Sequence, residues 1–331
     1  MQNDLHTTVQ HSLRDACQSF PERLQRLVVF VTDSDAPVFI SSAIADDLSE
    51  KTRALRARIH QESAYIKKRN AAGMAYHPTV LGGVAGIKMI GLLREMPGVF
   101  TPRYTLEMRT LYVLDHEIGH QVMERGMIGG HEGECRADAF AALRHIQRFG
   151  LDSDFFKYAN KASTLVLGTS PIHYTDDILA AVRRHACKHD ISALSLDETA
   201  ALAHDIVGRH MHTRISHHLL AMKFNDAAQA YHQRYETPHN IVRALYGRDE
   251  EAYALFCRET AKVMHASADN ADVIKAGKRF LNYPPVKEFI KDQARHSEEW
   301  QDILRLSNIR VPRQRARDPK MSGYSFSMRV A

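Results

Sequence analysis

Apolar residues recur at helical spacing along most of the chain. Where apolar positions lie three or four residues apart among good helix formers, the pattern predicts an amphipathic helix. Three of these segments also carry residues typical of helix ends. Pro102 suits the first position of one helix, Gly150 lies just past the C-terminus of another, and Asp197 can cap the N-terminus of a third. The segments predicted to be helical are residues 43–69, 83–95, 102–125, 132–148, 174–189, 197–222, 249–266 and 286–306.

One stretch near the N-terminus breaks this helical pattern. Residues 26–41, RLVVFVTDSDAPVFIS, contain two short runs of β-forming residues around a turn rich in Asp, Ser and Pro. Such a pattern predicts two strands joined by a turn. The expected fold class is therefore α+β and mostly helical, with a small N-terminal β-sheet and an α-helical C-terminal half.

Length and composition indicate a soluble globular protein. The 331 residues can bury a full core, and 44% hydrophobic and 25% charged residues are ordinary values for such proteins. We expect a first domain at residues 1–190, a helical domain at 191–307 and a basic flexible tail at 308–331. The formal net charge of +5 is concentrated in that tail, which favours a solvated end over a nucleic-acid-binding surface.

The N-terminus and the cysteines favour a cytoplasmic protein. The first residues are polar and lack the basic and apolar regions of a secretory signal, and no apolar run is long enough to cross a bilayer. The four cysteines form no Cys-x-x-Cys pair, which favours reduced thiols. Export by a specialised secretion route would give the same features, and no membrane partner is expected.

The candidate chemistry lies in residues 111–140, LYVLDHEIGHQVMERGMIGGHEGECRADAF. His116 and His120 are four residues apart on a predicted helix, so both rings project from one face and can bind a single zinc ion. Glu117 follows the first histidine, where its carboxylate can reach a water at the metal. Because the chain contains 20 histidines, this motif alone is weak evidence, and its setting has to support it.

The setting supplies a third ligand, which a water-activating zinc ion needs. The segment GMIGG at 126–130 predicts a tight reversal, and the helix that follows carries Glu134 and Asp138 on one face. Glu134 can complete the site, and Asp138 can accept a hydrogen bond from the second ring nitrogen of His116. His131, at the start of this helix, is the alternative third ligand.

HEIGH followed by ECRAD resembles the gluzincin clan of zinc metallopeptidases, the thermolysin-like group, over about residues 105–148. The resemblance implies a zincin-like catalytic domain that binds one zinc ion. The implied roles are His116, His120 and Glu134 as metal ligands, Glu117 as general base, and Asp138 as the carboxylate behind a ligand. The interval between His120 and Glu134 is shorter than this clan usually has.

Peptide hydrolysis also needs a donor for the oxyanion that forms at the attacked carbonyl. His173 and Tyr174 stand just before a predicted helix and are the first candidates, with Tyr158 and Tyr112 as alternatives. The preferred function is a zinc metallopeptidase acting on a protein or peptide substrate, which could add as an extended strand along the N-terminal sheet. The sequence leaves open a helical binding or regulatory protein whose zinc site is closed by His131, and a nucleic-acid-associated protein that uses the tail.

Overall fold

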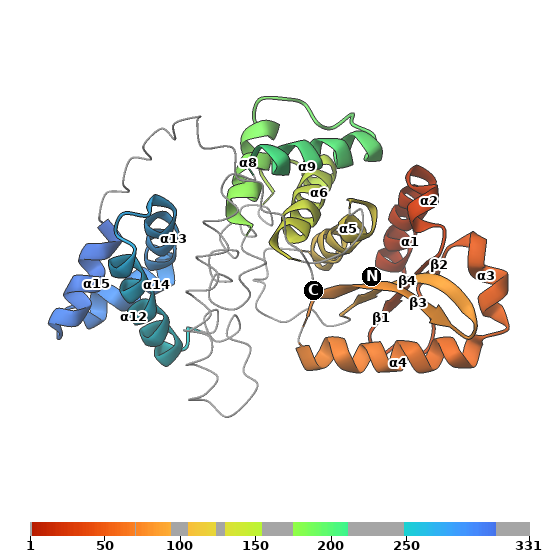
Figure 1. The fold of residues 1–331 in the computed structure, drawn as a ribbon, viewed down its shortest axis with the longest axis horizontal. Helices are drawn as coiled ribbons and strands as arrows, with labels where there is room; N and C mark the ends of the chain where they lie inside the picture. The colour runs from red at the N-terminus through yellow and green to blue at the C-terminus, as the bar shows by residue number, and fades with distance from the viewer. Residues whose placement is uncertain are drawn as a thin grey trace, which may run out of the picture. The chain divides into compact units, whose positions relative to one another are not determined.

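The structure of the protein is a computed structural model that describes residues 2–69, 71–93, 105–123, 130–153, 175–210 and 248–308. His173, Tyr174, Tyr158 and the predicted tail beyond residue 308 lie outside the described residues. In chain order the helices and strands are α1 (Gln2–Ser19), α2 (Pro21–Leu24), β1 (Leu27–Val31), β2 (Phe39–Ile40), α3 (Ser42–Ser49), α4 (Thr52–Arg69), β3 (Gly73–Leu81), β4 (Val84–Leu92), α5 (Leu106–Met123), α6 (His131–Phe149), α8 (Asp176–Ala186), α9 (Leu196–His210), α12 (Glu250–Ala266), α13 (Ala271–Leu281), α14 (Pro284–Gln293) and α15 (Glu298–Asn308) (Figure 1).

Helices dominate the described residues, and their strands form one mixed four-stranded sheet, which confirms the mostly helical α+β class. The strand order is β2-β1-β4-β3, with β1 parallel to β4 and both outer pairs antiparallel. Among the described strands, β3 therefore forms one edge of the sheet. The chain divides into two compact units, Met1–Phe256 and Cys257–Ala331. The domain boundaries expected near residues 190 and 307 stay predictions.

The sheet is covered on both faces, which explains why β1 is a continuous apolar run. Leu27 and Val29 belong to a core shared with α1, α5 and α6. Val28 and Phe30 point the other way, into a second core shared with α3 and α4. Figure 1 shows α4 running along one face of the sheet, with α1 and α5 on the opposite side. The first core holds the helices that carry the candidate site.

The segment 83–95, predicted to be helical, is instead strand β4, preceded by β3. Gly82 and Gly83 have φ angles of 57° and 91°, which favour glycine, and they form the tight turn between the two strands. Met89 and Ile90 are both fully buried, on opposite faces of the sheet. A short apolar run buried on both sides has no periodicity that separates it from a buried helix, and this is why the prediction failed.

Most of the other predicted helices are present, but two of them divide. The predicted helix 43–69 is interrupted at residues 50–51 between α3 and α4, and 286–306 is interrupted at 294–297 between α14 and α15. The predicted helix 197–222 is α9 up to His210, and the remainder lies outside the described residues. The two predicted strands within 26–41 are β1 and β2, paired antiparallel.

The sequence pattern does not predict α1 or α13. In α1 the buried side chains of Val9, Leu13 and Ala16 form a narrow stripe on an otherwise polar helix, so its mean hydropathy is low. The short helix α13 begins at Asn270, whose side chain accepts hydrogen bonds from the backbone of Asp272 and Val273. The packing of this narrow stripe stabilises α1, whereas α13 combines its cap with a buried apolar face that includes Val273, Ile274 and Phe280.

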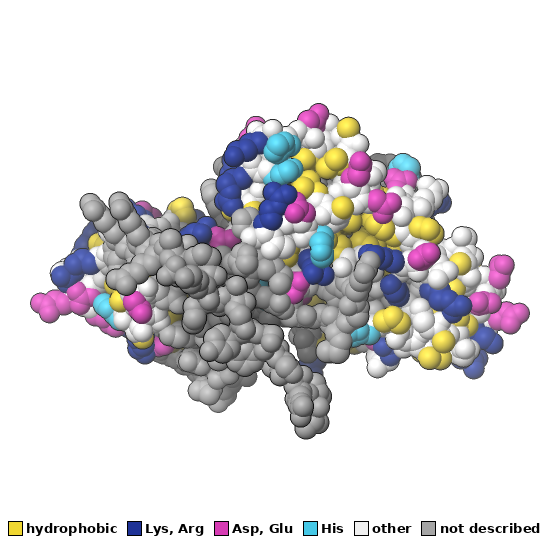
Figure 2. Space-filling model, turned by 45° about the horizontal axis from the view of Figure 1, so that its top comes forward, with side chains coloured by type: hydrophobic (Ala, Val, Ile, Leu, Met, Phe, Trp, Pro, Cys, Tyr) yellow, Lys and Arg dark blue, Asp and Glu magenta, His cyan; other side chains and the backbone are white. Residues whose placement is uncertain are grey.

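The described surface carries charges of both signs, as the face drawn in Figure 2 shows. The large hydrophobic side chains exposed among the described residues are Tyr65, Val80 and Leu106, which lie on three different elements. Within the described part of the chain, every helix is too short or too polar to cross a membrane.

A buried ion pair ties α5 to α6. Asp115, next to His116 in the chain, is only 2% exposed. Arg148, near the end of α6, donates to both of its carboxylate oxygens, and its Nη2 lies 3.1 Å from Oδ1. The same Nη2 donates to Ser12 of α1 at 2.8 Å. A two-point contact of this kind fixes the rotation and the axial position of one helix against the other.

Replacing Arg148 should test how much this ion pair stabilises the fold. Arg148→Met leaves Asp115 buried without its cation and should lower the free energy of unfolding by about 3 kcal/mol. The control Arg209→Met removes an exposed pair with Asp205 in α9 and should cost less than about 1 kcal/mol. Urea denaturation of both variants measures the difference, and equal losses would contradict a special role for the buried pair.

Candidate metal centre

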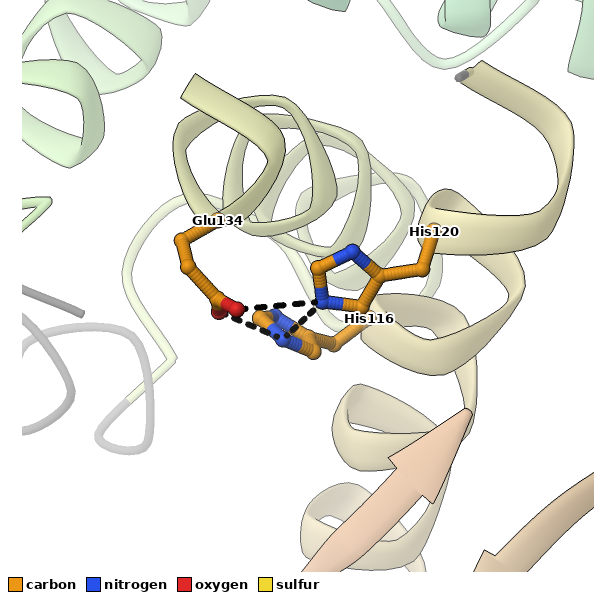
Figure 3. Close-up of side chains that lie close together, drawn as sticks. All are labelled: His116, His120 and Glu134. Carbon is orange, nitrogen blue, oxygen red and sulfur yellow. Dashed lines mark hydrogen bonds and ion pairs between the residues drawn. The ribbon is translucent and has the colours of Figure 1, made fainter. Parts of the chain in front are cut away.

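Two helices bring three metal-ligating side chains to one point. His116 and His120 lie one turn apart on α5, and Glu134 lies in the first turn of α6 (Figure 3). The two Nε2 atoms are 3.1 Å apart. Glu134 Oε2 lies 3.3 Å from His116 Nε2, and its Oε1 lies 3.6 Å from His120 Nε2. These three residues form a group that could hold a metal ion.

The separations suit a small four-coordinate ion. Bonds of about 2.0–2.2 Å in a tetrahedral arrangement place neighbouring ligand atoms roughly 3.3–3.6 Å apart. The observed separations of 3.1, 3.3 and 3.6 Å are close to that interval. Two imidazoles and one carboxylate are also a donor set that zinc accepts, with a fourth position left for a water or a substrate. The group therefore fits zinc in both spacing and chemistry.

The ligands can converge because α5 and α6 approach closely at Gly119. A methyl group built on Gly119 would lie 2.9 Å from the Cα atom of Ala137 and 3.3 Å from its carbonyl oxygen. Contacts that short to backbone atoms cannot be relieved by a side-chain rotation. Gly119 lies between the two histidines, and Ala137 lies between Glu134 and Asp138, so the contact stands at the centre of the site.

Asp138 is hydrogen-bonded to the ring nitrogen of His116 that does not face the other ligands. Its Oδ1 lies 2.7 Å from His116 Nδ1, so a proton donated there leaves the Nε2 lone pair for a metal. Its Oδ2 accepts a hydrogen bond from Thr175, the residue before α8. Burial lowers the pKa of His116, but Asp138 and Glu134 outweigh that effect and raise it well above its ordinary value. The pKa of His120 is likewise lowered by burial and raised overall through Glu134.

Glu117 lies beside the ligand group without belonging to it. Its side chain is 6% exposed and packs against the start of β3, where a methyl group on Gly73 would come within 2.9 Å of Oε1. Burial raises the pKa of Glu117; the two histidines and a hydrogen bond from the backbone of Ala75 lower it, and the net direction is upward. A carboxylate with a raised pKa is a better proton acceptor and donor near neutral pH.

The outer edge of β3 faces this glutamate. Leu93 donates its N–H to the carbonyl of Ala72 at 2.9 Å, so these two residues form a hydrogen-bonded pair. Along an antiparallel ladder, hydrogen-bonded pairs alternate with pairs that are not bonded to each other. Residues 74 and 76 therefore pair with β4, whereas the backbone groups of Gly73 and Ala75 point away from the sheet. The side-chain amide of Gln121 on α5 donates to the carbonyl of Tyr76 at 3.2 Å and holds the strand against the helix.

The structure groups the histidine pair with Glu134 rather than with His131, the alternative ligand. The Nε2 atom of His131 instead lies 3.4 Å from the Sγ atom of Cys135. Tyr112, an alternative oxyanion donor, is hydrogen-bonded to Asp138. His173 and Tyr174 lie outside the described residues, so their role stays a prediction.

Sequence reasoning missed Thr175 and β3 as parts of the site. Thr175 is 37 residues from its partner Asp138, too far for any local spacing to reveal. Strand β3 was missed because residues 73–81 fell outside every predicted helix and strand, and residues 83–95 were predicted to form a helix. Gly119 did carry a signal, since a glycine inside a helix costs about 1 kcal/mol relative to alanine and then usually has a packing reason.

Comparison with known proteins adds no relative: no family model, curated protein or solved structure matches this chain.

A single methyl group should test the α5–α6 contact. Gly119→Ala should push the helices apart at Ala137 and weaken zinc binding on the order of tenfold, although alanine is the better helix former. The control Gly208→Ala adds the same group to α9, where nothing lies within 4 Å, and should leave zinc affinity unchanged. Competition with a chromophoric chelator measures both affinities, and wild-type affinity in Gly119→Ala would contradict the role of this contact.

Proposed function

We propose that the protein is a zinc-dependent metallopeptidase of the gluzincin type, acting on peptide bonds in a protein or peptide substrate. The observation that carries the proposal is the position of Glu117, a buried carboxylate next to three convergent ligands but outside their group. A zinc ion held by His116, His120 and Glu134 would supply Lewis-acid chemistry, acidifying a water and polarising a carbonyl.

Glu117 is the general base in this proposal. It takes a proton from the attacking water and then delivers it to the nitrogen of the leaving amine, so it acts in both halves of the reaction. The raised pKa of its carboxyl group suits this exchange. The hydrogen bond from Ala75 keeps the carboxylate oriented at the strand edge, so it need not be ordered at the moment of reaction.

The outer edge of β3 supports an extended substrate. The outward backbone groups of Gly73 and the carbonyl of Ala75 can pair with a peptide that adds as a further strand, while the N–H of Ala75 stays bonded to Glu117. Because that edge touches Glu117, a peptide bond in the added strand would lie beside the base. This arrangement supports the zincin-like character of the fold, and it favours a chain-like substrate over a compact small molecule.

A structural zinc site in a binding or regulatory protein is the competing proposal. Structural sites are normally closed by four protein ligands. The group has three members among the described residues, and His131, the residue best placed in sequence to close it, contacts Cys135 instead. The described geometry therefore favours the hydrolytic proposal. A nucleic-acid partner would bind through the tail, which lies outside the described residues, so that alternative stays a prediction.

Replacing the proposed general base should strongly reduce peptide hydrolysis without preventing zinc binding. Glu117→Gln should keep zinc bound, because Glu117 is not a ligand, and should lower peptide hydrolysis by about 10²–10⁴-fold. The control Glu107→Gln changes an exposed glutamate on the same helix and should have wild-type turnover. Cleavage of an unstructured protein, with and without chelator, provides the measurement. Unchanged hydrolysis in Glu117→Gln would rule out the mechanism.

A further inference from the structure

Asp138 receives hydrogen bonds from three side chains, two on α5 and one just before α8. His116 on α5 contacts Oδ1 at 2.7 Å, and Thr175, before α8, donates to Oδ2. The side chain of Tyr112, also on α5, is hydrogen-bonded to the same carboxylate. Only the first of these contacts is implied by the spacing of the zinc motif. The other two have no part in binding a metal directly.

Thr175 is held rigidly where it meets Asp138. It is 2% exposed, and its backbone carbonyl accepts the first hydrogen bonds of α8, from Ile178 at 2.9 Å and from Leu179 at 3.0 Å. The position of its hydroxyl group is therefore set by the start of a helix that packs on α6. A carboxylate can rotate about its last bond, but with Oδ2 bound to Thr175 its other oxygen is directed at His116.

We propose that Thr175 and Tyr112 are positioning residues that set the metal affinity of the site through Asp138. They orient the carboxylate, the carboxylate fixes the ring of His116, and the ring presents Nε2 at the ligand point. The inference rests on the metal centre of the proposed function, but it concerns binding and does not require hydrolysis. Carboxylates behind a ligand histidine typically change metal affinity by about 10–100-fold, and their own supports should contribute part of that.

The same contacts couple the metal to α8. If the bond from Thr175 strengthens metal binding, metal binding must strengthen that bond by the same free energy. Zinc should therefore slow amide hydrogen exchange at Ile178 and Leu179, whose N–H groups bind the Thr175 carbonyl. The first turn of α8 becomes a reporter of the metal centre.

The test compares three threonine variants by zinc competition with a chelator. Thr175→Val keeps the shape but removes the hydroxyl group and should weaken zinc binding on the order of tenfold, whereas Thr175→Ser should retain most of the affinity. The control Thr199→Val makes the same exchange at a fully buried threonine whose hydroxyl donates to the carbonyl of Ser195 at 2.8 Å, and it should bind zinc normally.

Two further variants test whether the effect passes through Asp138. Tyr112→Phe removes the second supporting hydroxyl and should also weaken binding several-fold. In an Asp138→Ala background, Thr175→Val should cause no additional loss, because the acceptor is gone. The zinc-induced slowing of exchange at Ile178 should disappear in Thr175→Val and persist in Thr199→Val.

Wild-type zinc affinity in both Thr175→Val and Tyr112→Phe would overturn the inference. A full additional loss for Thr175→Val on top of Asp138→Ala would also overturn it, because the threonine would then act by packing. A wild-type chain that binds zinc but cleaves no peptide would refute the proposed function and leave this inference standing. A chain that binds no zinc would overturn both.

Discussion

The close contact between α5 and α6 at Gly119 governs the candidate site. Packed helices usually lie 8–10 Å apart, and the distance depends on the side chains at the crossing. With hydrogen at Gly119 and methyl at Ala137, the crossing leaves room for the imidazole rings on one side to reach the carboxylates on the other. The buried pair of Asp115 and Arg148 then prevents the helices from sliding, so two local features define one rigid frame.

The packed pair of helices places several ionisable groups in a buried region, where a charge without a partner is costly. Two imidazoles and three carboxylates lie largely shielded from water around the crossing, and each needs a partner to offset desolvation. The structure supplies partners from outside the helix pair: β3 contributes Ala75 to Glu117, and the start of α8 contributes Thr175 to Asp138. The sheet and α8 therefore do more than cover the core. They hold the ionisable groups in orientations that packing alone would not specify.

The sequence predicted the local parts of this arrangement and missed the long-range parts. Helical spacing places His116 with His120, and the glycine-rich turn returns Glu134 to them, so the ligand group follows from residues within one short segment. The strand beside Glu117, β3, is a partly exposed edge strand, and it was missed together with its partner β4. The pattern of β4 predicted a helix because a doubly buried apolar run has no diagnostic period. The contact from Thr175 could not be inferred because it depends on how α8 packs against α6, which is a tertiary property. The sequence favoured Glu134 over His131 as the third ligand, and the structure groups Glu134 with the two histidines.

X-ray absorption at the zinc edge on the purified, zinc-loaded protein tests the central claim most directly. The account predicts one zinc ion per chain with two imidazole nitrogens at about 2.0–2.1 Å and only nitrogen or oxygen in the remaining positions. In Glu134→Gln the two imidazole signals should persist while affinity falls. A third imidazole, which would point to His131, or a sulfur ligand at about 2.3 Å, which would point to Cys135, would contradict the account, as would a chain that takes up no zinc.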